Sequence, residues 1–193
     1  MSAEGGAPAV STPARILAAT AHRIATGGAA DLTLQEVAEA AGVSKALIAY
    51  HFSDKTELLA RTTEWLCREV VARERAALDG VTPAQVVDAL WTWIDGELAR
   101  GDVRVLLALA QVEAERVRDA ARSASESRRA TATRTVARLF DALSLTPRVP
   151  HRLVANAAVA LMDGLALDAG LTPERNRRPI FDAFWLAMLS LAE

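Results

Sequence analysis

The sequence predicts an all-α protein, and three observations support this fold class. Alanine, leucine and valine supply most of the 51% of residues that are hydrophobic, and alanine is the strongest helix former. Apolar residues recur at helical spacing through most of the chain, and no segment shows the alternation of a β-strand. Gly and Pro interrupt these patterns at intervals that fit separate helices. With 193 residues, the chain can form one large domain or two small ones.

The composition argues against several classes of protein. No apolar run reaches the roughly 18 residues of a membrane-spanning helix, and the N-terminal segment lacks the features of a signal peptide, so we expect a cytoplasmic protein. Cys67 is the only cysteine and is expected to be a small buried hydrophobe rather than a redox group. The three histidines are scattered and do not form a metal-binding pattern. We therefore predict neither a metal nor a cofactor.

The sequence also lacks the short motifs of common enzymes. It contains no HExxH, no CxxC pair, no nucleophile elbow and no Gly-rich phosphate loop after a strand. No Ser/His/acid or Cys/His grouping stands out either. We therefore predict that the protein is not an enzyme.

The N-terminal region is predicted to contain a disordered tail and a first helix. Residues 1–11 are small and polar, with nothing to bury. Thr12 can cap the helix, with Pro13 in the first helical position, where the missing N–H costs nothing. Gly27 and Gly28 are expected to end it.

Two short helices joined by a tight turn are predicted next. Thr33 and Glu36 form a capping box, in which each side chain accepts a hydrogen bond from the other residue's backbone N–H. Gly42 fits the left-handed position after a helix, and Ser44 can cap a third helix that runs to about Phe52. This spacing is typical of a helix-turn-helix.

The third helix is predicted to present a bare outer face. On a wheel of about 100° per residue, Ile48 and Phe52 point toward the core. Ala46, Leu47 and Tyr50 then point away from it. A helix that is narrow at its N-terminal end and aromatic at its C-terminal end suits insertion into the major groove of DNA.

Each outward residue then has a chemical role on DNA. Ala46 and Leu47 can contact thymine methyl groups, while Lys45 can reach a guanine edge or a phosphate. Four residues are placed for phosphates: Tyr50, His51, Lys55 and Thr33. The alternative is that the tyrosine and histidine complete a small core and that both lysines are only solvated.

Residues 33–59, TLQEVAEAAGVSKALIAYHFSDKTELL, resemble the DNA-binding signature of the TetR family of bacterial transcription regulators. The second half of the chain resembles the family only in architecture. The resemblance implies a three-helix DNA-binding domain, a larger helical domain with a ligand pocket, and a homodimer that represses its target until an effector binds. It also implies eight DNA-contacting residues: Thr33, Ser44, Lys45, Ala46, Leu47, Tyr50, His51 and Lys55. Ala49 departs from the pattern, since many members carry tyrosine there, and one phosphate contact is expected to be missing.

The charge of the N-terminal region is low for a DNA-binding unit. Residues 1–60 contain four Lys or Arg and six Asp or Glu, a net charge of −2. We therefore expect weak non-specific affinity for DNA and a shallow dependence on salt. A second reading follows from this charge: a helical small-molecule-binding protein whose DNA-binding unit is weakened.

The rest of the chain is predicted to be a series of helices. Their ranges are 54–78, 82–100, a segment opened by Asp102, and roughly 124–144, 150–169 and 173–192. The polar segment SASESRR, 123–129, is expected to be either a kink between helices or a solvated face. We assign residues 12–60 to a DNA-binding domain and 61–193 to effector binding and dimerisation.

A largely apolar effector pocket is predicted in the second domain. Aromatic side chains on facing helices can form its walls, although they also commonly fill cores. The residues predicted to line it are Trp65, Trp91, Ile94, Leu109, Glu113 and Met162. An inward-facing Glu113 would favour a cationic or hydrogen-bonding ligand, whereas the alternative is a solvated charge.

The last two helices are predicted to form the homodimer interface. In residues 153–171, Ala157, Ala160 and Gly164 allow close approach of another helix, and the apolar surface is too wide for a surface helix of a monomer. The interface is placed in residues of about 150–170 and 174–192, as a four-helix bundle across a two-fold axis. The alternative is that both helices are buried inside one monomer. Two-fold symmetry implies a pseudo-palindromic operator with half-sites roughly 34 Å apart.

Overall fold

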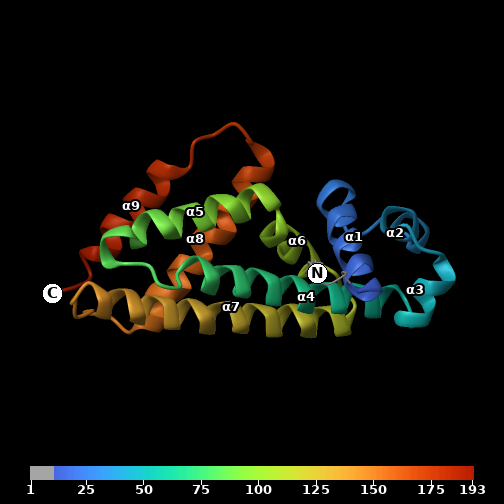
Figure 1. The fold of residues 1–193 in the computed structure, drawn as a ribbon, viewed down its shortest axis with the longest axis horizontal. Coiled ribbons are helices and arrows are strands. Elements are labelled where there is room, and N and C mark those ends of the chain that lie inside the picture. Colours follow the sequence, from blue (N-terminus) through green and yellow to red (C-terminus); the bar gives the residue numbers. More distant parts are fainter. Residues whose placement is uncertain (1–10) are drawn as a thin grey trace, which may run out of the picture.

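The structure, a computed structural model, describes residues 11–193 and consists of packed helices (Figure 1). Between these residues no β-strand occurs, apart from an isolated bridge between Pro147 and Ala192. The α-helices are α1 (Thr12–Gly27), α2 (Leu34–Ala41), α3 (Lys45–His51), α4 (Lys55–Ala77), α5 (Val86–Arg100), α6 (Asp102–Leu109), α7 (Glu115–Ala142), α8 (His151–Leu171) and α9 (Arg178–Leu189), with a 3-10 turn at Pro83–Gln85. The predicted all-α fold is confirmed. Apart from Ser11, the predicted tail lies outside the described residues.

Helices α1, α2 and α3 form a small block at one end of the molecule (Figure 1). Each contributes a fully buried aliphatic side chain to a shared core: Ile16, Val37 and Ile48. The α1 boundary differs by one residue from the prediction. Ser11 occupies the cap position and Thr12 is already helical, because the Ser11 carbonyl accepts the first helical hydrogen bond, from the Arg15 N–H.

The turn between α2 and α3 has the predicted geometry. Gly42 adopts a left-handed φ of 63°, and the next residue, Val43, donates its N–H to the Ala38 carbonyl at 3.0 Å. The Ser44 hydroxyl then accepts the Leu47 N–H at 3.1 Å and caps α3. Backbone and cap hydrogen bonds therefore fix the direction in which α3 leaves α2.

Helix α4 extends from this block into the larger helical region, and α7 lies beside it (Figure 1). The two helices run in the same direction: Arg116 pairs with Glu57 near their starts, and Thr135 bonds to Glu74 further along both. One continuous hydrophobic cluster includes residues of both the block and the larger region. The predicted domain boundary after residue 60 falls inside α4, which runs from Lys55 to Ala77.

The predicted helix start at residue 124 is wrong, because α7 begins at Glu115 and the break lies at residues 110–114. The segment SASESRR is a regular part of α7 rather than a kink. Its polar composition hides a buried stripe at four-residue spacing: Ala120, Ala124, Arg128 and Ala132. Cys67 packs on this stripe as a buried hydrophobe, as predicted, and burial raises the pKa of its thiol.

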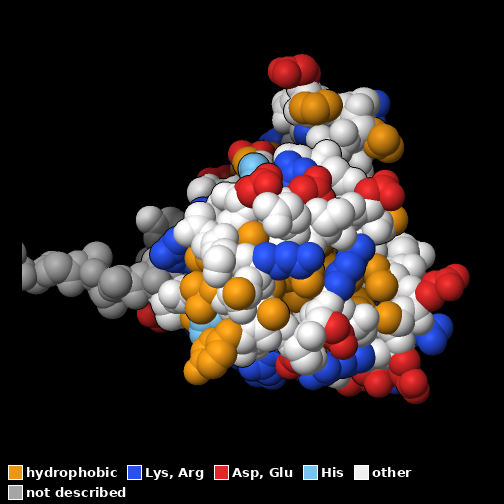
Figure 2. Space-filling view, turned by 90° about the vertical axis from the view of Figure 1, so that its right-hand side faces the viewer, with side chains coloured by type: hydrophobic (Ala, Val, Ile, Leu, Met, Phe, Trp, Pro, Cys, Tyr) orange, Lys and Arg blue, Asp and Glu red, His pale blue; other side chains and the backbone are white. Residues whose placement is uncertain are grey.

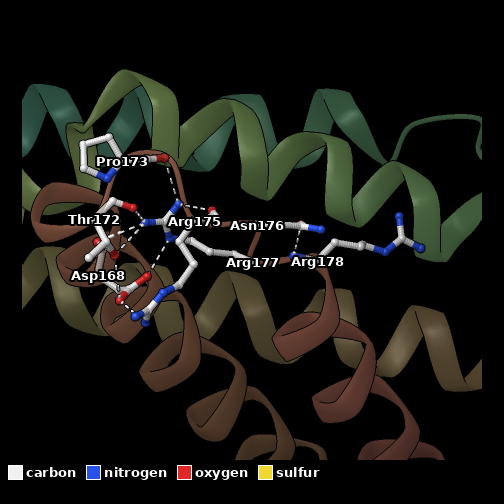
Figure 3. A network of polar contacts seen from close by, with 7 residues as sticks. All are labelled: Asp168, Thr172, Pro173, Arg175, Asn176, Arg177 and Arg178. Carbon is white, nitrogen blue, oxygen red and sulfur yellow. Dashed lines mark hydrogen bonds and ion pairs between the residues drawn. The ribbon is translucent and has the colours of Figure 1, made fainter.

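The last helix begins at Arg178 and not at residue 173, because the preceding loop is organised around a buried arginine (Figure 3). The Arg177 guanidinium donates to the Asp168 carboxylate at 2.9 Å. It also donates to the backbone carbonyls of Asp168, Thr172 and Arg175. The Asp168 and Thr172 carbonyls also accept backbone N–H groups, from Thr172 and Arg175, so the guanidinium adds a second donor to each of them and ties the loop to the end of α8.

An ion cluster joins the later part of α4 to the junction of α5 and α6. Arg73 donates to both carboxylate oxygens of Glu97, at 2.5 and 2.9 Å, and to Asp102 at 2.6 Å. Glu97 is only 2% exposed. Arg73 is therefore the main partner of a carboxylate that solvent scarcely reaches, and a buried carboxylate without a partner is strongly unfavourable.

Substitution of Gly42 tests the turn. A Gly42→Ala variant is expected to lose about 1 kcal/mol of unfolding free energy, because the left-handed backbone is unfavourable for alanine. No steric clash contributes, since the nearest atom to an added Cβ is 3.7 Å away. Urea denaturation measures the loss. Gly27→Ala is the control: that glycine has no positive φ and open space around it, so no loss is expected. Equal effects of the two changes would contradict the proposed role of Gly42.

Removal of Arg73 tests the ion cluster. Arg73→Ala is expected to lower the unfolding free energy by about 3 kcal/mol, because Glu97 would keep a buried charge without its main partner. Chemical denaturation of the variant provides the measurement. Arg61→Ala, which removes an exposed pair with Glu64, should change stability by less than about 1 kcal/mol. A small effect at Arg73 would show that the cluster does not hold α4.

Candidate functional site

Helix α3 lies at the surface with one face bare. Ile48 is fully buried and Phe52 is nearly so, as the helical wheel predicts, whereas Tyr50 is 82% exposed. The neighbouring His51 is half-buried, and its ring lies edge-on to Tyr50 at a centroid distance of 5.1 Å. Three further side chains on α3 are exposed: Lys45, Ala46 and Ala49. Leu47 is half-buried between the two faces.

The start of α2 is held by a network around Glu36. The Thr33 N–H and hydroxyl both donate to Glu36 Oε2, at 2.9 and 2.8 Å, and Arg23 donates to Oε1 at 2.6 Å. These contacts, the Thr33 N–H foremost, lower the pKa of Glu36 below its usual value of 4.5. Its contribution to stability is therefore present above that pH and is lost as the pH falls through the lowered value. The start of α2 is fixed at neutral pH, with Thr33 at the surface.

The start of α4 is fixed to its surroundings in the same way. Lys55 donates from Nζ to the Ala30 carbonyl at 2.9 Å, which holds the connection between α1 and α2. Asp54 caps the helix by accepting the Glu57 N–H. Glu57 accepts from Ser53 and from Arg116 of α7, and its pKa is lowered chiefly by the Ser53 hydroxyl. One N–H of the Lys55 ammonium group is thus used in a contact within the protein, and its other two N–H groups can donate to a ligand such as a phosphate.

The sequence-predicted DNA-binding residues occupy the starts of three helices and one exposed face. Thr33 lies at the start of α2, Ser44 caps α3, and Lys55 opens α4. Figure 2 shows this end of the molecule, where acidic and basic side chains are interspersed rather than gathered into one basic area. Phosphates at such a surface would be bound mainly by helix N-termini and neutral donors.

An apolar cavity of about 110 Å³ lies between α4, α5, α7, α8 and α9. Side chains from all five helices line it, including Val70, Ile94, Phe140, Met162, Phe181 and Trp185. Two of the six residues predicted for the effector pocket, Ile94 and Met162, are in this wall.

The other four predicted pocket residues lie elsewhere. Leu109 is fully buried in the main core, and Trp65 packs against that core. The ring of Trp91 packs against that of Phe181 in a tilted arrangement, at a centroid distance of 5.4 Å. Glu113 is exposed and borders a separate hollow beside the α1–α2 connection. The structure thus does not bring these four residues to the cavity.

Three polar residues of the cavity wall were not predicted from the sequence: Glu74, Arg128 and Thr135. Glu74 is 6% exposed and accepts a hydrogen bond from Thr135 at 2.7 Å. Arg128 pairs with Asp163 at 2.6 Å. Burial raises the pKa of Glu74 more than the Thr135 hydrogen bond and nearby arginines lower it. A signal was present in the sequence, since Glu74 continues the four-residue spacing of Leu66, Val70 and Leu78 on the buried side of α4.

Helices α8 and α9 carry an unusual amount of exposed apolar surface. In the described chain, five of the six exposed large hydrophobic residues are on these two helices: Leu153, Leu167, Leu171, Ile180 and Leu186. By length and composition alone α8 could also span a membrane, but helices in protein cores pass the same test. Leu171 and Leu186 are 82% and 67% exposed, which marks this surface as one that another apolar surface can cover.

Comparisons with known proteins agree with this architecture. The model for bacterial regulatory proteins of the tetR family matches residues 16–62. The HTH-type transcriptional regulator CymR of Pseudomonas putida is 36% identical over 75 residues, which is 39% of this chain and 37% of CymR. The chain therefore matches well under half the length of that relative.

Solved structures resemble almost the whole chain. A transcriptional regulator from Rhodococcus sp. Rha1 is 26% identical, with a TM-score of 0.73 over 94% of this chain and 98% of that one. NalD, the secondary repressor of the MexAB-OprM multidrug efflux pump in Pseudomonas aeruginosa, is 20% identical, with a TM-score of 0.62 over 94% and 95%. The family-model match thus places residues 16–62, which include the exposed α3, with the DNA-binding region of the tetR family of bacterial regulatory proteins, and the solved structures show that the rest of the chain shares the all-helical fold of such transcription regulators.

Proposed function

We propose that the protein is a cytoplasmic, ligand-responsive repressor that binds a pseudo-palindromic operator as a homodimer and is released by a small-molecule effector. The observation that carries this proposal is the bare face of α3, set on a buried Ile48 at one end of the molecule. In this proposal residues 12–60 bind DNA, and residues 61–193 bind the effector and dimerise. NalD, which shares the fold, is itself a repressor.

In the proposed complex, α3 enters the major groove with its N-terminal end first. Lys45, Ala46 and Leu47 meet base edges or nearby phosphates, and Tyr50 and His51 contact the flanking backbone. The starts of α2 and α4 offer Thr33 and Lys55 to phosphates, and Ser44 does the same at the start of α3. The exposure of Tyr50, Lys45 and Ala46 supports these roles.

In the proposed dimer, α8 and α9 of two copies pack as a four-helix bundle across a two-fold axis. The exposed leucines of both helices would be buried there. Such a dimer presents two copies of α3 to half-sites about one helical turn apart on DNA, roughly 34 Å.

The proposed effector site is the cavity between α4 and α9, with Ile94 and Met162 in its wall. Because α4 lines the cavity and also packs on α1, a ligand that favours one tilt of α4 would change the separation of the two α3 helices. Effector and DNA would then compete by linkage.

A second candidate function is a helical small-molecule-binding protein with a weakened DNA-binding unit. The mixed charges around α3 and the net charge of −2 in residues 1–60 favour it. Selection of bound sequences from a random DNA pool separates the two candidates. Enrichment of a two-fold symmetric site supports the repressor, and no enrichment by the folded protein supports the alternative.

The proposed phosphate contacts give a direct test. Tyr50→Phe and Lys55→Ala are each expected to weaken operator binding about five- to tenfold, because each removes a hydrogen bond worth roughly 1 kcal/mol. Gel-shift titration on the selected operator and on mismatched DNA should show the same loss on both, since phosphate contacts carry no sequence information. Arg138→Ala, an exposed arginine near the far end of α7, is the control for loss of one positive charge. Unchanged affinity in the Tyr50 and Lys55 variants would remove these roles.

The proposed dimer interface is tested by a charge on its surface. Leu186→Glu is expected to give a monomer in sedimentation or light-scattering measurements, because a carboxylate would be buried on association. The monomer should keep its helical content, since Leu186 is 67% exposed within one chain. Ala130→Glu on the exposed side of α7 should leave the oligomeric state unchanged. A wild-type monomer, or a dimer of the Leu186 variant, would contradict the interface.

A further inference from the structure

We propose that the effector cavity selects a small apolar compound that carries a protonated amine, with the ammonium group bound by Glu74. This inference rests on the proposed function, because it names the ligand class of the same cavity. It depends on Glu74, the one carboxylate that the fold places in this mostly apolar wall.

Glu74 has hydrogen-bonding capacity that the protein leaves unused. Its Oε1 accepts from the Thr135 hydroxyl at 2.7 Å, and its Oε2 has no hydrogen-bond partner among residues 11–193. A carboxylate can accept about four hydrogen bonds. A ligand donor in the cavity can therefore bond to Glu74 without breaking an existing contact.

The charges around the cavity favour a cation. Arg128 also lines the wall, but its guanidinium is bound to Asp163 at 2.6 Å. Glu74, Arg128 and Asp163 together carry one net negative charge when all are ionised. Arg75 and Arg134 also act on Glu74, but both are exposed, so solvent screens them.

The alternatives to a cation leave buried charge uncompensated. A carboxylate ligand would bring a second negative charge beside Glu74, and a purely apolar ligand would remove water from the carboxylate without replacing its hydrogen bonds. An ammonium group supplies both charge and donors. The aromatic rings of Trp93, Phe184 and Trp185 in the same wall also attract cations through their faces.

The size of the cavity limits the apolar part of the ligand. Its volume is about 110 Å³. A dry cavity of about 150 Å³ in another protein accommodates benzene. We therefore infer a compound with about one six-membered ring, and we choose benzylamine, toluene and benzoate as matched probes that share a ring and differ in charge.

Binding of the three probes to the full chain at pH 7 tests the proposal through tryptophan fluorescence and thermal shift. Glu74→Gln keeps the shape of the side chain and removes its charge. It is expected to weaken benzylamine binding roughly tenfold or more, the typical size of a lost charge-assisted hydrogen bond. Toluene should bind the variant at least as well as the wild type, and benzoate should bind it better.

Two controls keep the result interpretable. Glu113→Gln alters the exposed carboxylate at the separate hollow and should leave benzylamine affinity unchanged. The Glu74→Gln melting temperature should equal or exceed that of the wild type, and Glu74→Met supplies a second uncharged variant if the first fails to fold. Equal benzylamine affinity in wild type and Glu74 variants, or a loss at Glu113 instead, would overturn the proposal.

A parallel operator titration tests the ligand class and the repressor function separately. If the chain binds its operator but shows no Glu74-dependent amine binding, the proposed ligand class is wrong and the proposed repressor function is still supported. If benzylamine binds through Glu74 but the chain selects no DNA, the proposed ligand class is supported and the proposed repressor function is wrong.

Discussion

The burial of α4 along almost its whole length is the constraint on which both halves of the molecule depend. Leu58 and Leu59 are buried in its first turns, and Leu66 and Val70 continue the same core further on. The middle of the helix contains Thr62 and Thr63, which are also fully buried. Their hydroxyls donate to carbonyls four residues earlier in α4, so no other element has to satisfy them. The core can therefore continue without a polar gap, and close packing transmits a displacement of α4 from one end to the other.

Successive residues on α4 attach it to different neighbours. Side chains one residue apart on a helix point about 100° apart. Arg73 accordingly binds Glu97 and Asp102 of the α5–α6 junction, while Glu74 turns toward α7 and the cavity. A ligand bound to Glu74 would thus act on a turn of helix whose other side is held by an ion cluster. Nearer the DNA-binding block, Glu57 and Arg116 form a second attachment to α7. In the proposed mechanism, the effector shifts the balance between two positions of α4 that these attachments permit.

The sequence allowed closer prediction of the DNA-binding block than of the second domain, for a physical reason. The start of α2, the turn at Gly42 and the cap of α3 are fixed by interactions within a few residues, and such signals are readable from the sequence. The course of α7 depends instead on its contact with α4, where Arg128 is buried despite its charge. The start of α9 depends on Arg177, which binds carbonyls across a loop. Glu74 is a similar case, because only the arrangement of five helices shows that its carboxylate borders a cavity.

The DNA-binding block has a low charge. In the proposed dimer, the separation of the two α3 helices is therefore the property through which an effector can most effectively regulate DNA binding. Few lysines and arginines face the proposed DNA surface, so one copy would displace few counterions and gain little sequence-independent affinity. Two linked copies bind with a much higher effective concentration, but only if both half-sites can be reached together. A small change in the separation of the two α3 helices would remove that advantage without altering any single DNA contact. The apolar surfaces of α8 and α9 set this separation in the proposed dimer, and α4 is the element through which a bound effector would change it.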